Sequence, residues 1–117
     1  MRHLEDDLQM ACVKWFDLQH PMLKALLFHV PNGGHRNERE AARFKAMGVR
    51  PGVPDLLLLY PKQGFHFLAL ELKAGKNTQT FEQKRYESLL THRAGGKYVV
   101  IRSIDDFIEA VSSYLEG

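Results

Sequence analysis

The sequence predicts an α/β fold in which a mixed β-sheet is flanked by helices. Along the 117 residues, apolar runs of strand length alternate with segments whose apolar positions recur every three to four residues, as in helices. Two of the strand-like runs follow each other after a short turn, which a purely parallel βαβ array does not allow. The expected order of elements is therefore α-β-α-β-β-α-β-α, within a single domain over residues 1–117.

The composition is that of an ordinary globular protein, with 44% hydrophobic residues, 26% charged residues and a net charge of +2. The single cysteine, Cys12, excludes an intramolecular disulfide and a cysteine-rich zinc site. It also favours a reducing, cytoplasmic environment. No apolar run approaches the roughly 20 residues of a membrane span, so no membrane partner is expected.

The first third of the chain is expected to hold a helix, a strand and a loop. Residues 4–19 form the helix, which Pro21 ends. Its apolar positions are spaced by three and four: Leu4, Leu8, Ala11, Cys12, Trp15 and Leu18. The apolar run 26–30, bounded by Pro31, is a short strand. The segment PNGGHRN, 31–37, has the composition of a loop.

The middle of the chain is expected to hold a second helix and a hairpin. The helix covers residues 38–47 and ends at Gly48. A loop rich in glycine and proline, 48–54, follows it. The runs DLLLLY, 55–60, and FHFLALELK, 65–73, flank the turn PKQG, which is the spacing of an antiparallel pair.

The last third is expected to hold a helix, a strand and a final helix. After a loop at 74–78, Thr80 is the expected N-cap of a helix that runs to about Arg93. The run KYVVIR, 97–102, is the last strand. The final helix has a continuous apolar stripe: Ile104, Phe107, Ile108, Val111 and Leu115.

Two charged residues stand at the end of the second hairpin strand. Because side chains alternate across a strand, its residues divide into two faces. The apolar face consists of Leu68, Leu70 and Leu72. The other face consists of Phe67, Ala69, Glu71 and Lys73. In an antiparallel pair the start of one strand lies beside the end of the next, so Asp55, Glu71 and Lys73 are expected to converge at one edge of the sheet.

This convergence predicts a metal site. Two adjacent carboxylates repel each other unless a cation neutralises them. Mg²⁺ prefers oxygen ligands, so Asp55, Glu71 and the backbone carbonyl of Leu72 are candidate ligands. Lys73 could orient the attacking water or stabilise charge on a phosphate. The alternative is a structural ion pair at the end of an edge strand, where charges discourage aggregation.

The chain resembles the virus-type replication-repair nuclease domain, VRR-NUC, of the PD-(D/E)xK nuclease superfamily. Five pieces in the same order carry the resemblance: EDDLQ at 5–9, PNGGHR at 31–36, GVRPGVPD at 48–55, ELK at 71–73, and TFEQ at 80–83 followed by Tyr86. A lone aspartate followed by ExK is common by chance, whereas all five pieces together are specific.

The resemblance implies a restriction-endonuclease-like core and phosphodiester hydrolysis that depends on Mg²⁺ or Mn²⁺. It assigns Asp55 and Glu71 to the metal and makes Lys73 the catalytic lysine. It adds Glu5 as a further acidic residue of the site and a possible metal ligand, and Gln83 as a glutamine that lines the site.

Glu5 and Gln83 each have a structural alternative. Acidic residues are favoured in the first turn of a helix, so Glu5 could be no more than a solvated acid there. Thr80 and Gln83 have the spacing of a capping box, in which the glutamine bonds back to the Thr80 backbone. For Gln83 the two interpretations have equal support.

Candidate contacts to DNA lie in two segments. An arginine stripe near helical spacing could contact phosphates: Arg36, Arg39, Arg43 and Arg50. Loop residues could do the same through their N–H groups or side chains: Asn32, Gly33, Gly34, Lys76 and Asn77. The alternatives are a solvated helix face balanced by Glu38 and Glu40, and ordinary loop polarity.

A nucleotide cofactor is not expected. The segment AGKNT ends like a phosphate-binding loop, but Leu70 stands where that motif has its first glycine. Asn77 also replaces the serine or threonine that contacts Mg²⁺.

The sequence therefore predicts a metal-dependent endonuclease that selects DNA by shape. Stand-alone members of the family it resembles act as homodimers that cut four-way DNA junctions. A Holliday-junction-resolvase-like activity is accordingly expected, in a phage-encoded protein of the host cytoplasm. The alternatives are an endonuclease for flaps or nicked duplexes and a DNA-binding module that does not cleave.

Overall fold

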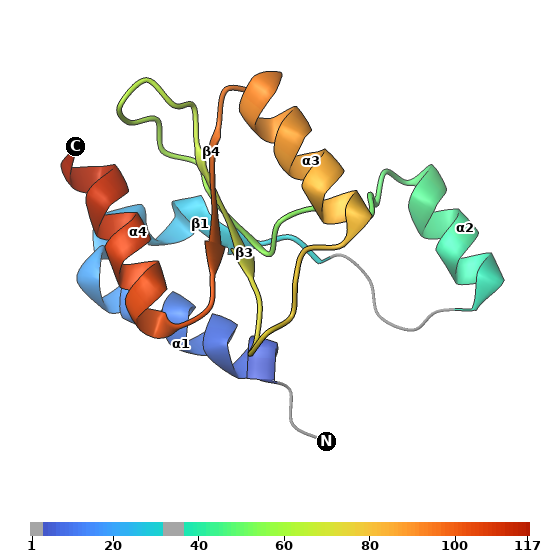
Figure 1. Cartoon of the computed structure of the whole chain (residues 1–117), viewed down its shortest axis with the longest axis horizontal. Coiled ribbons are helices and arrows are strands. Elements are labelled where there is room, and N and C mark those ends of the chain that lie inside the picture. The colour runs from blue at the N-terminus through green and yellow to red at the C-terminus, as the bar shows by residue number, and fades with distance from the viewer. Residues whose placement is uncertain (1–3, 32–36) are drawn as a thin grey trace.

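The computed structural model describes residues 4–31 and 37–117. Its elements in chain order are α1 (Leu4–Gln19), the 3₁₀ helix η1 (Pro21–Leu26), β1 (Leu27–His29), α2 (Glu38–Ala46), β2 (Leu56–Leu58), β3 (Leu68–Leu72), α3 (Phe81–His92), β4 (Lys97–Ile101) and α4 (Ile104–Glu116). The predicted fold class and the predicted order of α-helices and strands are confirmed (Figure 1).

The four strands form one mixed sheet in the order β1-β2-β3-β4. β1 with β2 and β2 with β3 are antiparallel pairs, as expected for the hairpin, with Leu56 opposite Leu70. β3 and β4 are parallel, with Glu71 beside Val100. β3 therefore lies inside the sheet, and the charges at its end do not belong to an edge strand.

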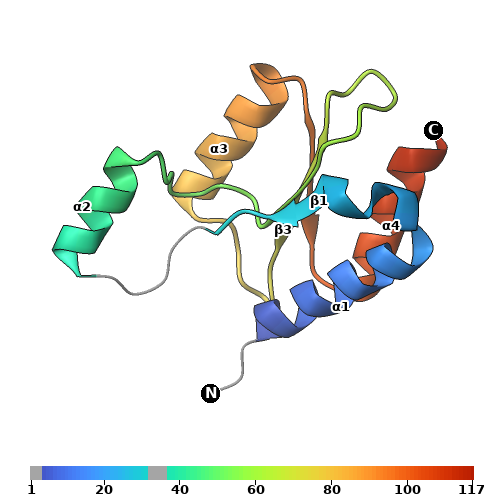
Figure 2. The same ribbon diagram turned by 180° about the vertical axis from the view of Figure 1, so that it is seen from behind.

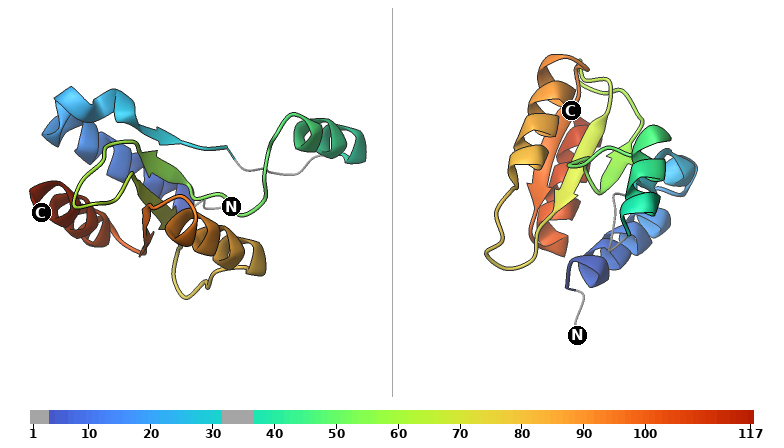
Figure 3. Two further views of the ribbon diagram at one scale, coloured as in Figure 1. Left: turned by 90° about the horizontal axis from the view of Figure 1, so that it is seen from above. Right: turned by 90° about the vertical axis from the view of Figure 1, so that its right-hand side faces the viewer.

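Helices cover both faces of the sheet (Figures 1 and 3). α1 and α4 pack on one face and on each other, and α3 packs on the opposite face against β4. α2 stands apart from these layers in both views along the short axis (Figures 1 and 2), and none of its residues is buried.

The main hydrophobic core lies between the sheet and the α1–α4 layer. It includes the three leucines of β3, as their alternation predicts. The buried members of the core are Cys12, Phe16, Leu27, Leu56, Leu58, Leu68, Leu70, Leu72, Ile101, Phe107, Val111 and Tyr114. This packing fixes which way β3 faces, because a shift of one residue would turn Glu71 into the core.

The opposite face of β3 is also buried, which alternation alone did not predict. Ala69 and Glu71 are fully covered, and Lys73 is 7% exposed. The cover comes from the α3 side of the sheet, where Tyr98 of β4 and the segment before α3 approach Glu71. The charged face is therefore part of the interior.

The element bounds differ from the sequence prediction mainly at the strands. The predicted strands 26–30, 55–60 and 65–73 shorten to the three, three and five residues of β1, β2 and β3. The hairpin connection carries only an isolated bridge between Lys62 and Phe65. The 3₁₀ helix η1 was not predicted, because six residues give too little periodicity to identify. Among the described residues, no helix combines the length and the apolar composition that a membrane crossing requires.

A glycine fixes the loop 48–54 to the first turn of α3. Gly52 is buried and has φ +84°, and a Cβ built on it would lie 2.4 Å from the backbone oxygen of Glu82. Gly48 has φ +102° with no atom within 4 Å of such a Cβ. A side chain at Gly48 would therefore meet only the unfavourable positive φ, whereas a side chain at Gly52 would also collide with the backbone of α3.

We expect Gly52→Ala to lower the free energy of unfolding by about 3 kcal/mol, since it adds a backbone collision to the unfavourable φ. Gly48→Ala should cost only about 1 kcal/mol, from the φ alone. Urea unfolding of both variants measures the difference. Equal losses would show that the loop can withdraw from α3 without cost.

Candidate active site

Asp55 lies at the point where β2 begins, beside the end of β3. Its Oδ2 accepts a hydrogen bond of 2.7 Å from the backbone N–H of Leu72. The hairpin register brings the two residues together, as the sequence predicted from the antiparallel pairing. The backbone bond holds the carboxylate against the end of the strand.

The carbonyl of Leu72 faces the same side as Asp55. The N–H of Lys73 donates to the carbonyl of Ile101 in β4, at 2.9 Å. In a trans peptide the carbonyl of one residue and the N–H of the next point in opposite directions. The Leu72 oxygen therefore points away from β4, toward the strand that Asp55 precedes.

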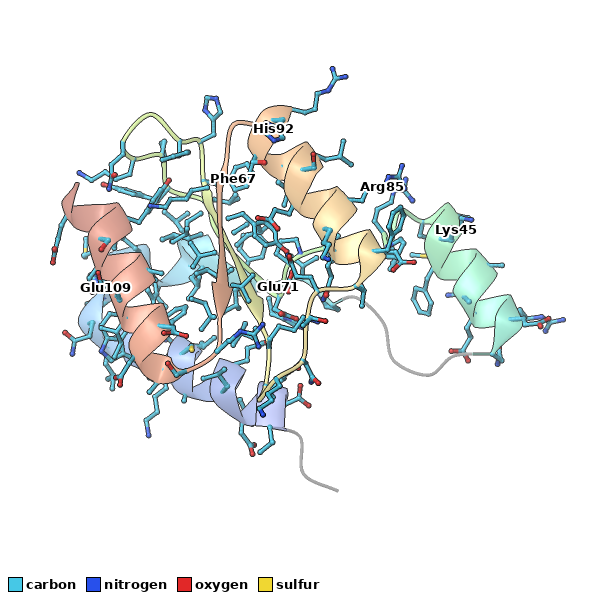
Figure 4. The ribbon with its side chains drawn as sticks, viewed as in Figure 1. Lys45, Phe67, Glu71, Arg85, His92 and Glu109 are labelled. Carbon is cyan, nitrogen blue, oxygen red and sulfur yellow. The ribbon has the colours of Figure 1, made fainter. Side chains whose placement is uncertain are left out.

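Glu71 is fully buried between the sheet and α3 (Figure 4). Its Oε1 accepts a hydrogen bond of 3.2 Å from the Gln79 amide and a short hydrogen bond from the Tyr98 hydroxyl. Its Oε2 is buried and has no hydrogen-bond partner among the residues that the structure describes. A buried carboxylate oxygen without a partner is costly, because it has lost water and gained nothing in exchange.

Glu5 reaches the site from the first turn of α1. Its Oε2 accepts hydrogen bonds from the backbone N–H of Ala74, at 3.0 Å, and from the Asn77 amide, at 3.3 Å. The residue thus joins α1 to the loop that leaves β3, and it is more than a solvated acid of the helix start. Asn77 is engaged in the same contact.

The carboxylates influence each other electrostatically. Burial raises the pKa of Asp55 above its ordinary value, and the Leu72 N–H opposes this shift. The negative charges of Glu5 and Glu71 raise the Asp55 pKa further, while His29 lowers it. Burial and the two neighbouring carboxylates thus disfavour the ionised form of Asp55, and a bound cation would offset this effect.

Lys73 follows Glu71 on the same face of the chain and is 7% exposed. Over residues 4–31 and 37–117, its ammonium makes no hydrogen bond or ion pair. The alternative prediction of a structural ion pair between Glu71 and Lys73 therefore has no contact to support it in this structure. A nearly buried, unpaired ammonium is instead available to a substrate or a water molecule.

The residues present fit a divalent cation that also takes ligands from water and substrate. In the part of the chain that the structure describes, no group of three or more His, Cys, Asp or Glu side chains could hold a metal alone. Mg²⁺, however, commonly uses only one or two carboxylates and completes its shell with water and phosphate oxygens. Asp55 Oδ1, the orphaned Glu71 Oε2 and the Leu72 carbonyl have the chemistry for such a set.

Gln83 forms the capping box that was one of its two interpretations. Its side-chain oxygen accepts from the Thr80 N–H at 2.9 Å, and the Thr80 hydroxyl accepts from the Gln83 N–H at 3.2 Å. Gln79, four residues earlier, is the glutamine that contacts Glu71. The structure thus brings Asp55, Glu71, Lys73 and Glu5 to one end of the sheet and leaves Gln83 at the start of α3.

Sequence reasoning missed three polar residues around the carboxylates: His29, Gln79 and Tyr98. His29 Nδ1 lies 2.8 Å from the backbone oxygen of Asp55. Tyr98 could have been found from the alternation of its strand, had the parallel register with β3 been known. Gln79 carries no comparable signal, because it lies in an irregular segment.

The predicted DNA-contact residues are dispersed. Arg39 and Arg43 lie on the projecting α2, and Arg50 follows it, donating to the Lys45 carbonyl at 3.2 Å. Lys76 is exposed in the loop after β3. The remaining candidates, Asn32, Gly33, Gly34 and Arg36, lie outside the described residues.

A groove between the loop 48–54 and the outer side of α3 gathers further arginines. It has a volume of about 480 Å³. Its lining residues are Arg50, Pro51, Glu82, Arg85, Tyr86, Leu89, Leu90, Arg93 and Ala94. Figure 4 shows Arg85 extending from α3 toward α2. Three arginines, one carboxylate and several apolar side chains thus line the groove.

No family model and no curated protein matches the sequence. The structure, however, is similar to a solved structure described as "VRR_NUC domain protein", with a TM-score of 0.84 and 30% sequence identity. The match covers 99% of this chain and 91% of that one. The chain therefore belongs to the VRR-NUC family and has its PD-(D/E)xK nuclease core.

Proposed function

We propose that this protein is a metal-dependent endonuclease that hydrolyses phosphodiester bonds in DNA. The observation that carries the proposal is the buried Glu71 carboxylate. Its Oε2 has no partner within residues 4–31 and 37–117, while Asp55 and Lys73 lie at the same end of the sheet. A structural carboxylate would be expected to have both oxygens satisfied. Membership of a nuclease family with the same motif supports a catalytic role for these residues.

Asp55, Glu71 and the Leu72 carbonyl would hold Mg²⁺ or Mn²⁺, with Glu5 as a possible further ligand. When bound, the cation lowers the pKa of its water and offsets charge on the phosphate. Water attacks phosphorus and loses a proton to solvent, one P–O bond forms, and the bond to the leaving oxygen breaks, with that oxygen taking up a proton from solvent. Lys73 Nζ donates a hydrogen bond to the attacking water or to a phosphate oxygen, which positions it and stabilises the developing charge.

Glu5 has a role on the protein side of this site. Its bonds to Ala74 and Asn77 hold the loop that follows Lys73. That loop also carries the exposed Lys76, for which we propose a contact to the phosphate next to the cleaved one. In the structure the Gln83 side chain caps the N-terminus of α3 by bonding the Thr80 backbone. It would line the site only after breaking this hydrogen bond.

The groove beside α3 is the proposed path of the DNA backbone away from the site. Arg50 stands five residues before Asp55 on the loop that Gly52 fixes to α3, so the groove and the site share one rigid segment. Its arginines outnumber its single carboxylate, which complements a phosphate backbone. Arg39 and Arg43 on α2 extend the basic surface beyond the groove.

Substituting Arg85 and Arg93 together by alanine is expected to weaken DNA binding about tenfold at moderate salt. The slope of log Kd against log salt should fall by about two, one per lost phosphate contact. Fluorescence anisotropy in EDTA, which prevents cleavage, measures both quantities. Lys14→Ala with Lys24→Ala is the matched control, because it removes the same charge from exposed sites in α1 and η1, away from the groove. Equal weakening in the two double variants would contradict a specific path.

A Holliday-junction-resolvase-like activity of a homodimer is the most specific form of the proposal. Each chain offers one set of Asp55, Glu71 and Lys73, whereas resolving a four-way junction requires two symmetric nicks. A two-fold dimer supplies two equivalent sites. The basic groove and α2 offer backbone contacts that read shape rather than base sequence.

Labelled four-way junction, flap, nicked duplex and linear duplex test the proposal, each with Mg²⁺ and with EDTA. We expect paired symmetric nicks in the junction, only with the metal, and a dimer in analytical ultracentrifugation. Cleavage of flap or nicked duplex but not of the junction would reject the resolvase activity and keep the nuclease. Binding without metal-dependent cleavage of any substrate would reject the nuclease and leave a DNA-binding module.

A further inference from the structure

The two oxygens of the Glu71 carboxylate have different surroundings. Both hydrogen bonds that the residue accepts end on Oε1, one from Gln79 Nε2 and one from the Tyr98 hydroxyl. Oε2 is also buried, and it accepts no hydrogen bond from the described part of the chain. Both hydrogen-bond donors therefore contact Oε1, which leaves Oε2 as the oxygen that can bind a cation.

Tyr98 is held in place by the sheet. It is paired with Ala69 in the parallel β3–β4 ladder, two residues from the level of Glu71, so it lies on the same α3 face of the sheet. Its position depends on the backbone of two neighbouring strands rather than on a loop. The hydroxyl thus approaches the carboxylate from a rigid element.

Gln79 is held in place by α3. Its Nε2 donates to Glu71 Oε1 at 3.2 Å and to Glu87 Oε1 at 2.8 Å. Both partners are carboxylates, so the NH₂ end of the amide must face them, and each of its two N–H groups is used. Glu87 belongs to α3, which couples the orientation of the amide to the helix.

We propose that Tyr98 and Gln79 are positioning residues of the metal site. They fix the rotation of the Glu71 carboxylate so that Oε2 is presented to the cation. This inference rests on the proposed function, because Oε2 is assigned a cation as its partner. The terminal torsion of a glutamate is otherwise broad, and two donors on one oxygen restrict it. Partners of this kind orient the ligands of metal sites in general.

The test is the Mn²⁺ affinity of Tyr98→Phe, measured from the EPR signal of free Mn²⁺ without DNA. Phenylalanine keeps the ring and removes only the hydroxyl that bonds Oε1. We expect the Mn²⁺ affinity to fall about tenfold or more. In cleavage assays at fixed subsaturating Mn²⁺, kcat should fall while the KM for DNA stays unchanged.

Tyr114→Phe is the matched control. Tyr114 is fully buried, whereas Tyr98 is half-buried, and the Tyr114 hydroxyl donates to the Tyr60 carbonyl at 2.6 Å, from α4 on the opposite face of the sheet. Both variants lose one hydrogen bond and should melt at lower temperature than the wild type. Only Tyr98→Phe should lose Mn²⁺ affinity.

Each result supports or overturns the inference. Wild-type Mn²⁺ affinity in Tyr98→Phe, or an equal loss in Tyr114→Phe, would reject a positioning role and leave the proposed function intact. Should Tyr98→Phe fail to fold, Gln79→Ala provides the same measurement from an irregular segment outside the sheet. If the wild type binds no Mn²⁺, or if Glu71→Gln binds it as well as the wild type, the proposed metal site is wrong and the inference fails with it.

Discussion

Replacing Asp55 by asparagine is expected to abolish DNA cleavage and to raise the melting temperature of the metal-free protein. The loss of activity follows from removing a charged ligand, and we expect at least about a 10³-fold fall in rate. The gain in stability follows from the raised pKa of Asp55. Asparagine can still accept the Leu72 N–H, so the contact that holds the strand end is kept.

The sign of the stability effect comes from proton linkage. The pKa of Asp55 in the folded protein lies above that in the unfolded chain, so the unfolded chain loses its proton first as the pH rises. Ionisation therefore favours unfolding, and this loss of stability is complete above the raised pKa. Asparagine does not ionise, so the variant does not lose this stability as the pH rises. The difference in melting temperature between Asp55→Asn and the wild type should narrow as the pH falls through the raised pKa and then below about 4, where the carboxyl of the unfolded chain also becomes protonated.

Calorimetry in EDTA at neutral pH tests this expectation, and Asp105→Asn is the control. Asp105 lies in the first turn of α4, where its charge favours the helix, so its removal should lower the melting temperature slightly. Adding Mg²⁺ should then stabilise the wild type but not Asp55→Asn, because only a folded site binds the ion. An Asp55→Asn protein that cleaves at the wild-type rate would reject the assignment of Asp55 to the site.

Lys73→Met is expected to reduce cleavage by about 10²- to 10⁴-fold while Mn²⁺ binding is retained. Methionine has a similar length and suits a nearly buried position, so the fold should tolerate it. The variant loses the ammonium that would position water or phosphate, and it keeps both carboxylates. Removing an unpaired, nearly buried charge should not lower stability.

Single-turnover cleavage and Mn²⁺ titration of the same sample separate the two roles. Lys24→Met, at an exposed position in η1, controls for the loss of one positive charge. A Lys73→Met protein with more than about a tenth of wild-type activity would show that the lysine is not required for the chemical step. Loss of Mn²⁺ binding in this variant would instead point to a structural role.

The part of the site that lies within the hairpin could be predicted from the sequence. In an antiparallel pair the start of one strand lies beside the end of the next, so Asp55 was expected near the end of the strand that carries Glu71, and the register with Leu56 opposite Leu70 places it there. Alternation then placed Glu71 and Lys73 on one face. These are local rules, and they held even though the strands are shorter than expected.

The contacts around Glu71 could not be predicted in the same way. Tyr98 is 27 residues away, and its register depends on how the α3 crossover returns the chain to the sheet. The burial of the charged face depends on the same crossover. At the start of α3, the capping box used Gln83 locally and left Gln79 as the glutamine that faces the carboxylate. The side chain of Gln83 bonds the nearby backbone N–H of Thr80, so Gln79 rather than Gln83 contacts Glu71.

The wide spacing of these contacts has a consequence for the synthesis of the protein. Glu5 bonds Ala74, which lies 69 positions later in the chain, and Glu71 bonds Tyr98, which lies 27 positions later. At about 5–20 residues per second, roughly 1–5 s pass between the addition of Glu71 and that of Tyr98. During that interval a ribosome-bound chain already contains both carboxylates and the lysine, but not the strand that orders them. The full set of contacts around Glu71 can therefore form only after most of the chain has been made.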